Sequence, residues 1–337
     1  MRKKISIYTI ANKVGVSTAT ISKVINNKGY VSEATSKRVL ATMQEYNYMP
    51  IQRKHTNNII GVVCFHNDRL LASPFTNKLM TGILQQTFEV GSELLIIDGN
   101  DLLKMNSEEL YRYRFLHSIR GFLLINADVE SPLMDAMTTS EIPFINVANT
   151  CTNFSFNYIS SYNYESTMEI IEYIIRMGHH RIAFVGTLIQ KMNCHNERYR
   201  GYLAAMERHH LSVDLDFVID IPDLKLETWS NAVKYLMGRS EAPTAIFFVN
   251  TECGNILHSV LTTLNYKIPA DVSLAGCYEM EGLFFPKNNF TSFAQPAEEI
   301  GSLAIKKLKE LSINPEKPIH LYVKNTISYG DTVKKLN

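Results

Sequence analysis

The residue types that could support catalysis or metal binding do not occur at the spacings that such chemistry needs. His179 and His180 are adjacent, as are His209 and His210. Neighbouring helix positions point about 100° apart, so neither pair makes a good metal site. The sequence contains no G-x-S-x-G, no H-E-x-x-H, no P-loop and no G-x-G-x-x-G after a strand. We therefore expect no metal, no cofactor and no enzymatic activity.

Basic residues are concentrated at the amino end of the chain. Residues 1–58 hold ten lysines and arginines against two acids, Glu33 and Glu45, which is a net charge of +8. The rest of the chain has a net charge of −7, although the total is only +1. This asymmetry indicates a segment that binds a polyanion, joined to an acidic body. A basic arm without a partner is the alternative.

The cysteine pattern and the hydropathy limit the class of protein. The five cysteines are widely spaced and form no C-x-x-C motif: Cys64, Cys151, Cys194, Cys253 and Cys277. Such a set is typical of reduced cytosolic thiols and not of a disulfide framework or a zinc site. No apolar stretch resembles a signal peptide, and none reaches the ~18 residues of a membrane helix. We expect a soluble, cytoplasmic protein.

Short helices are predicted over residues 1–49. Ser6 suits the N-cap of a helix that Gly15 ends, and Ser17 suits the N-cap of a second helix over residues 18–26. Apolar residues at spacings of three and four give each segment one apolar face. A third helix follows Ser32. Two helices joined by a tight glycine turn and braced by a third predict a helix-turn-helix.

The remainder of the chain has the pattern of an α/β protein. Residues 50–58 are polar and basic and predict a linker. Short apolar runs then alternate with amphipathic stretches such as 76–90 and 165–177, the runs being 59–65, 93–98, 121–126, 143–147, 181–185 and 244–248. This alternation is typical of parallel sheets with helices on both faces. Since residues 59–337 are too many for one such sheet, we expect two lobes with a cleft between them.

The segment Ser6–Asn26, SIYTIANKVGVSTATISKVIN, resembles the start of the LacI/GalR family of bacterial repressors, T-I-x-D-V-A-x-x-A-G-V-S-x-x-T-V-S-R-V-L-N. Further matches are Y-V-S-x-x-T at 30–35, I-G-V at 60–62, G-H-x-R-I-A at 178–183, R-x-x-G-Y at 198–202, Pro243-Thr244-Ala245 with Asn250, and Gln295-Pro296. The resemblance implies a small all-α helix-turn-helix head over 1–49, a shortened hinge over 50–58, and a two-lobed, periplasmic-binding-protein-like α/β sensor over 59–337. The N-lobe is expected at about 59–160 and 292–322, and the C-lobe at about 161–291 and 323–337.

The resemblance also implies that residues 18–26 form a recognition helix in the major groove of DNA. Thr18, Ala19 and Lys23 match its base-reading positions, with Lys23 where many members have arginine. Lysine can donate to guanine O6 and N7 but lacks the rigid fork of arginine. Further contacts, chiefly to phosphates, are expected from Tyr8, Ser17, Thr20, Ser22, Asn26 and Lys28. Alternatively, Thr20 and Ser22 are merely solvated.

The hinge departs from the family pattern. Only ten residues separate Pro50 from Gly61, fewer than in the family, and residues 51–58 contain no leucine that could enter the minor groove. Such apolar wedges are how proteins of this kind kink DNA. We therefore expect little kinking of the operator, with phosphate contacts from Arg53 and Lys54.

Effector contacts are implied by matching the sensor to the family residue by residue. Ser73, Pro74 and Phe75 match an N-P-F segment whose aromatic packs on a sugar. Further matched positions are Asn126, Arg198, Trp229, Asn250, Tyr278 and Gln295. Core packing is the alternative for Phe75 and Trp229, and a surface ion pair with Glu197 is the alternative for Arg198. Tyr278 stands where the family has an acid, and together with Trp229 it suggests an effector flatter or less hydroxylated than a hexose.

These features predict a homodimeric, DNA-binding transcriptional repressor that is controlled by a small molecule, such as a sugar or sugar derivative. Its operator should be a near-palindrome of double-stranded DNA, which mirrors the two-fold axis of the dimer. Two other classes stay open. A solute-binding protein for transport would lack the basic head, and an enzyme with a DNA-binding appendage would need the catalytic motifs that are absent.

Overall fold

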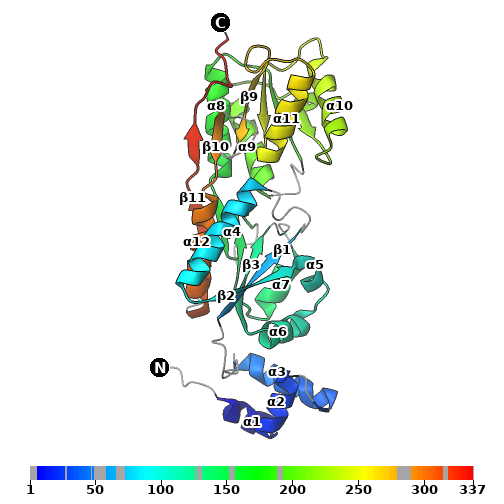
Figure 1. Ribbon diagram of the computed structural model, residues 1–337, viewed down its shortest axis with the longest axis vertical. Helices are drawn as coiled ribbons and strands as arrows, with labels where there is room; N and C mark the ends of the chain where they lie inside the picture. Colours follow the sequence, from blue (N-terminus) through cyan, green and yellow to red (C-terminus); the bar gives the residue numbers. More distant parts are fainter. Residues whose placement is uncertain are drawn as a thin grey trace.

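The computed structural model describes residues 6–26, 29–46, 48, 58–65, 73–125, 127, 131–151, 156–187, 193–278, 290–313 and 318–336. Three parts follow one another along the long axis of the molecule in Figure 1. They are a helical head, an α/β lobe next to it (the N-lobe) and a second α/β lobe (the C-lobe). None of the described helices is long and apolar enough to cross a membrane.

The head consists of α1 (Ile7–Val14), α2 (Thr18–Asn26) and α3 (Glu33–Glu45). Ser6 caps α1 through a reciprocal pair of hydrogen bonds with Thr9. Gly15 ends that helix with φ 74°, a left-handed conformation that glycine adopts without steric cost. The predicted three-helix arrangement and the predicted cap at Ser6 are therefore present, and Ser32, which precedes the third helix, caps α3.

The N-lobe is built on a six-stranded sheet in the order β11-β5-β4-β3-β1-β2, and every pair of neighbours is parallel. Its strands are β1 (Ile59–Cys64), β2 (Glu93–Asp98), β3 (Ile119–Ile125), β4 (Phe144–Val147), β5 (Tyr158–Ser161) and β11 (His320–Val323). Its helices are α4 (Pro74–Glu89), α5 (Gly99–Leu102), α6 (Ser107–Leu116), α7 (Pro132–Thr139) and α12 (Ala297–Ile313). Two apolar clusters pack on the sheet, one of them beneath α4 and α12 and the other beneath α6 and α7.

The C-lobe repeats this plan with the strand order β12-β10-β9-β8-β6-β7. Its strands are β6 (Ile182–Gly186), β7 (Val218–Asp220), β8 (Ala245–Phe248), β9 (Ser273–Cys277), β10 (Thr291–Ala294) and β12 (Thr326–Ser328). Its helices are α8 (Asn163–Arg176), α9 (Asn193–Arg208), α10 (Leu226–Met237) and α11 (Thr251–Thr263), with a 3₁₀ turn at Leu215–Phe217. Strand β12 is antiparallel to β10, a departure from the expected all-parallel sheets.

The chain passes between the lobes at three places among the described residues: after Ser161, at Gln295-Pro296, and between Val323 and Thr326. The expected boundary at 291/292 is wrong, because β10 pairs with β9 and β12 in the C-lobe sheet. The N-lobe resumes only with α12. Ser161 likewise belongs to the N-lobe strand β5 and not to the C-lobe.

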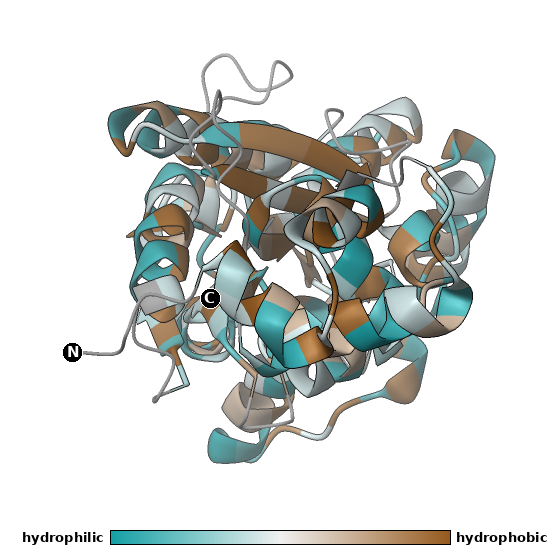
Figure 2. Ribbon diagram, turned by 90° about the horizontal axis from the view of Figure 1, so that it is seen from below, coloured by the Kyte–Doolittle hydropathy of each residue, from teal (hydrophilic) through white to brown (hydrophobic). Residues whose placement is uncertain are grey.

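Apolar strands and amphipathic helices form the layers that sequence periodicity predicts. In β3, β6 and β8 nearly every side chain is buried. The ribbons of the helices in Figure 2 carry both hydrophilic and hydrophobic colours along their length. Helices α4 and α12 pack so closely that a Cβ on Gly82 would lie 2.0 Å from the carbonyl oxygen of Glu298. A side chain at that position would therefore force the two helices apart.

Candidate DNA-binding and effector sites

Helix α2 has one buried and one open face. Ile21, Val24 and Ile25 lie in the head core together with residues of α1 and α3. The opposite face presents the side chains that match base-reading positions, with Ala19 and Lys23 exposed and Thr18 half-buried. Since an α-helix in the major groove contacts base edges through the first turns of its outer face, this surface has the geometry of a recognition helix.

The start of α2 is fixed by a local hydrogen-bonded cap. The Ser17 hydroxyl accepts from the Thr20 backbone N–H at 3.1 Å, and the Ser17 and Thr20 hydroxyl oxygens lie 2.9 Å apart. These two residues therefore have a structural role at the helix amino end. Their contact with phosphate stays a prediction, as does that of Ser22, which is exposed, and of Tyr8, which is 71% exposed. Lys28, Arg53, Lys54 and the Asn26 side chain lie outside the described residues.

Interactions among the head helices position α2. The Arg38 guanidinium donates to the Val14 carbonyl at 2.5 Å and so ties the end of α1 to α3. The Lys13 ammonium lies 5.5 Å from the centroid of the Tyr46 ring, and a hydrogen bond to Tyr46 raises the pKa of Lys13. Lys13 thus stays charged at neutral pH, beside the turn that joins α1 to α2.

Arg198 is the hub of a buried polar cluster where the two lobes meet, which we call the interlobe junction (Thr150, Ser161, Asn163, Glu197, Arg198 and Gln295). Its Nε and Nη2 donate to Asn163 Oδ1 at 3.0 and 2.8 Å, and its Nη1 donates to the Val249 carbonyl at 2.5 Å. Nη2 also donates to Gln295 Oε1 at 2.8 Å. Arg198 is only 2% exposed. The alternative of a surface ion pair with Glu197 is therefore wrong.

Gln295 connects Arg198 to the N-lobe sheet. Its Nε2 donates to the hydroxyl of Ser161 on β5 at 2.8 Å. Gln295 lies at one of the three passages of the chain and Ser161 directly precedes another, so this hydrogen bond joins two of the segments that connect the lobes. Arg198 and Gln295, two of the expected effector residues, thus lie in one cluster, and their contact with an effector stays a prediction.

Glu197 lies next to Arg198 and reaches across to the other lobe. Its carboxylate accepts from the Thr150 hydroxyl at 3.0 Å and from Asn163 Nδ2 at 3.2 Å. Thr150 follows β4 of the N-lobe, and it also accepts a hydrogen bond from Asn193 at the start of α9. Burial raises the pKa of Glu197, while the two hydrogen bonds and the charge of Arg198 act in the opposite direction.

The junction lies at the carboxyl ends of the parallel strands. Thr150 follows β4, Thr187 follows β6, and Val249 and Asn250 follow β8. Ligands of open α/β sheets bind at these ends. The His195 ring, which is 3% exposed, contacts the Thr187 carbonyl through Nδ1 at 2.7 Å. Burial and the charge of Arg198 lower the pKa of His195 to about 3, so the ring is neutral at physiological pH.

Four further expected effector contacts lie at the starts of helices. Asn250 caps α11, and its Oδ1 accepts from the Cys253 backbone N–H at 2.9 Å. Ser73 and Pro74 begin α4, with Phe75 half-buried against the N-lobe core. Their contact with an effector stays a prediction, and Asn126 lies outside the described residues.

Two expected effector residues are placed elsewhere. Trp229 is fully buried in the C-lobe core, and its indole N–H donates to the Asp223 carbonyl at 2.7 Å. Tyr278 is 2% exposed in the same core and stacks on Phe290 with 5.0 Å between the ring centroids. The expectation that these aromatic rings cover a ligand is corrected accordingly, and the inference of a flatter effector loses its basis.

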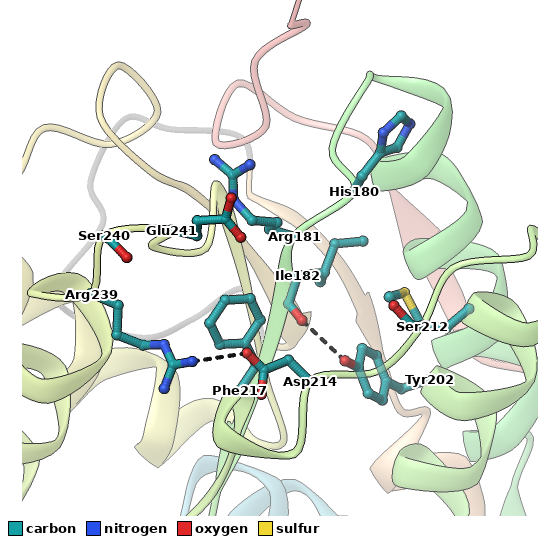
Figure 3. A pocket seen from close by; sticks show the side chains of 11 residues that line it. His180, Arg181, Ile182, Tyr202, Ser212, Asp214, Phe217, Arg239, Ser240 and Glu241 are labelled. Atoms are coloured by element: carbon teal, nitrogen blue, oxygen red, sulfur yellow. Dashed lines mark hydrogen bonds and ion pairs between the residues drawn. The ribbon is translucent and has the colours of Figure 1, made fainter.

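A pocket of about 560 Å³ opens at the other end of the C-lobe, beside the amino end of β6 (Figure 3). Its arginines are engaged within the protein: Arg239 pairs with Asp214 and Asp216 at 3.0 and 2.6 Å, and Arg181 donates to the Ala242 carbonyl. The Tyr202 hydroxyl in its wall donates to the Ile182 carbonyl. None of the residues expected to bind the effector lines this pocket.

Sequence reasoning missed Thr150, Ser161, Asn163 and Glu197 as junction residues. Glu197 carried a weak signal, since it directly precedes Arg198. Thr150 carried none, because it meets Glu197 across 47 positions of sequence.

Family models match both parts of the chain. "Bacterial regulatory proteins, lacI family" matches residues 6–50, and "Periplasmic binding protein-like domain" matches residues 171–333. Among curated proteins, the chain is 24% identical to the probable repressor ExuR of Bacillus subtilis, over 98% of this chain and 99% of that protein. It is 26% identical to the repressor PurR of Photobacterium profundum (95% and 99%) and 26% identical to the ribose operon repressor of Escherichia coli (88% and 89%).

Solved structures share the fold over nearly the whole chain. A complex of the transcriptional regulator CelR with cellobiose superposes with a TM-score of 0.70 at 23% identity, covering 97% of this chain and 99% of that one. A lac repressor dimer bound to operator and an anti-inducer gives a TM-score of 0.67 at 19% identity, covering 98% and 100%. Both the order and the type of the two parts are thus those of known regulators.

Proposed function

Because this chain belongs to the LacI/GalR family of bacterial transcriptional regulators, we propose that it represses transcription as a homodimer on a near-palindromic operator. A small molecule bound at the interlobe junction sets its affinity for DNA. The observation that carries the proposal is the joining of an open recognition helix to two lobes that meet in a buried polar cluster. The protein acts in the cytoplasm, where its operator is, and no catalytic step belongs to this function.

The head supports DNA binding through both shape and charge. Thr18, Ala19 and Lys23 are on the face of α2 that points away from the head core. Residues 1–58 carry a net charge of +8, which attracts the phosphate backbone. A transport protein for solutes has no use for such a head, so the alternative of a solute-binding protein is not favoured.

The junction supports control by a polar ligand. Its guanidinium, carboxylate and amide groups bond to one another in this structure, and these are the groups that would exchange such bonds for hydrogen bonds to a hydroxyl-rich ligand. The ribose operon repressor and the CelR–cellobiose complex are named for sugars. We extend this to the present chain as a sugar or sugar derivative. A ligand switches the protein only if it binds two arrangements of the lobes with different affinity.

DNA binding is tested with duplexes selected by the full-length protein from a randomised pool. The affinity for the selected sequence should fall steeply with salt, since each neutralised phosphate contributes a slope of about −0.9 in log K against log[salt]. A protein with no preference over scrambled duplexes would contradict the proposal.

The role of Lys23 is tested by Lys23→Ala, with Lys37→Ala as the matched control. Lys37 is an exposed lysine on α3 that pairs with Glu33 at 3.2 Å. If Lys23 reads a base, its removal costs about 1–3 kcal/mol and relaxes the preference at one position of each half-site. If both variants lose only salt-dependent affinity, Lys23 contacts phosphate alone.

The effector is sought by thermal-shift screening of sugars, nucleosides and sugar phosphates. A true effector raises the melting temperature and also changes operator affinity. A compound that stabilises the protein without altering DNA binding is a ligand but not the effector.

A further inference from the structure

One aromatic side chain of the N-lobe belongs to the hydrophobic core of the head. Helix α6 contributes Leu110 to the N-lobe core, as its place under the sheet requires. Phe115, near the end of the same helix, packs instead in the cluster formed by α1, α2 and α3. It is 4% exposed. The head is therefore docked on the sensor through side-chain packing. Figure 1 shows the head helices next to α6.

The two faces of α6 explain this division. Leu110 and Arg114 are one turn apart, and Arg114 donates to the Ile119 and Arg120 carbonyls at 3.1 and 3.2 Å. These bonds fasten the end of α6 to β3 in the N-lobe sheet. Tyr111 and Phe115 are likewise one turn apart on another face, and both are buried. Helix α6 thus lies between a strand of the sensor and the head.

The docked head keeps its DNA-binding surface open. Helix α2 contacts α6, yet Ala19 and Lys23 remain exposed and Thr18 half-buried. The contact uses the apolar side of the head and leaves the polar side of the recognition helix to solvent. The packing is therefore compatible with DNA binding and does not block it.

We propose that Phe115 is a positioning residue that holds the recognition helix in a fixed orientation on the sensor, so that α6 transmits changes in the N-lobe to the head. This inference rests on the proposed function in DNA binding. The covalent link limits the distance between the head and the sensor, but packing is needed to fix the orientation of the head on the sensor. Because the head is tethered, its effective concentration at α6 is high, which favours the docked state formed by this packing.

The test compares Phe115→Ala with Leu116→Ala in the full-length protein. Leu116 is the next residue on α6, is 38% exposed and is not part of the head cluster. Hydrogen exchange of the amides in α1, α2 and α3 reports docking without any DNA. Losing the buried phenyl ring should speed their exchange about ten- to a hundredfold in Phe115→Ala, because burying such a side chain is worth that factor. Leu116→Ala should leave their exchange unchanged, and Phe115→Leu should restore most of the protection.

Affinity for the selected DNA provides the second readout. Phe115→Ala should bind at least tenfold more weakly, with an unchanged salt slope, because orientation and not phosphate contact is lost. Equal behaviour of the Phe115 and Leu116 variants in both assays would overturn the inference. Loss of protection in β3 as well as in the head would also overturn it, since Phe115 would then support the N-lobe core. If the wild-type chain selects no DNA, the proposed function fails, while the exchange contrast still decides whether Phe115 docks the head.

Discussion

At the scale of single residues, Arg198 shows how one side chain links distant segments. Its donors serve Asn163, the Val249 carbonyl and Gln295, which belong to α8, to the end of β8 and to a passage between the lobes. A planar guanidinium holds its five N–H donors in a rigid fork, whereas an ammonium is a compact charge with three rotatable donors on a flexible stem. The identity of this residue is therefore set by geometry as well as by charge.

Replacing Arg198 by lysine should lower the free energy of unfolding by about 1–3 kcal/mol, because buried acceptors lose their donors. Arg200→Lys is the control, since Arg200 is exposed on the same helix. Urea unfolding of both variants measures the difference. Equal stability would mean that the hydrogen bonds of Arg198 are dispensable for the fold.

His195 should give the protein an acid-sensitive stability. Its pKa is lowered from 6.5 to about 3 in the folded state, so between these pH values the unfolded chain binds a proton that the folded chain does not. The free energy of unfolding therefore falls as the pH is lowered through this window, by up to about 1.4 kcal/mol per pH unit for one group. Glu197, whose pKa is raised, acts in the opposite direction above its ordinary pKa. Urea unfolding at pH 7 and pH 5 should show a smaller loss in His195→Gln than in the wild type, and an equal loss would refute this role.

The sequence could not place every residue of the site. Arg198 and Gln295 were found because the motifs around them carry over from the family. Trp229 and Tyr278 were misplaced because an aromatic residue type favours burial without telling whether a ligand or the core covers it. Thr150 and Glu197 were missed because their contact depends on how two lobes meet, which no local pattern encodes.

At the scale of elements, local sequence signals predicted the helices and strands more completely than they predicted the residues of the site. The cap at Ser6 and the end of the first helix at Gly15 were both recognisable from residue type. The apolar runs predicted strands to within a few residues, as with 93–98 and β2. The assignment of β10 to the C-lobe was beyond reach, because strand order is set by pairing between segments distant in sequence.

Gly15 offers a test of the head at this scale. No atom lies within 4 Å of a Cβ placed there, so the cost of Gly15→Ala is the left-handed backbone alone, about 1–2 kcal/mol. Gly15→Asn should cost less, because asparagine tolerates this conformation better. Hydrogen exchange in α1 and operator affinity measure both variants. Equal losses of protection and of operator affinity in the two variants would show that the left-handed backbone conformation is not the reason for glycine at position 15.

At the scale of the whole molecule, the proposed homodimer requires each sensor to communicate with a recognition helix on a shared operator. The segment expected to act as a shortened hinge, residues 50–58, lies almost entirely outside the described residues. Its sequence still lacks the leucine that would wedge into the minor groove. Communication through α6 would lessen the need for a folded hinge.

The absence of a wedge predicts an operator that stays nearly straight. Inserting an apolar side chain at a base step bends DNA by about 20–90°. Among residues 51–58 only Ile51, at the start of the segment, is apolar. Gel mobility of complexes on circularly permuted fragments should therefore vary little with the position of the operator. A strong minimum of mobility with the site at the centre of the fragment would refute this prediction.

The three passages of the chain between the lobes have a mechanical consequence. Three parallel connecting segments permit the lobes to bend about one axis, while they resist sliding and separation of the two lobes. Cleavage of the backbone at any one passage would leave two connections intact. A sensor cleaved there should therefore still sediment as a single species. We therefore expect any movement between the lobes to be mainly a bending about the axis set by these three passages.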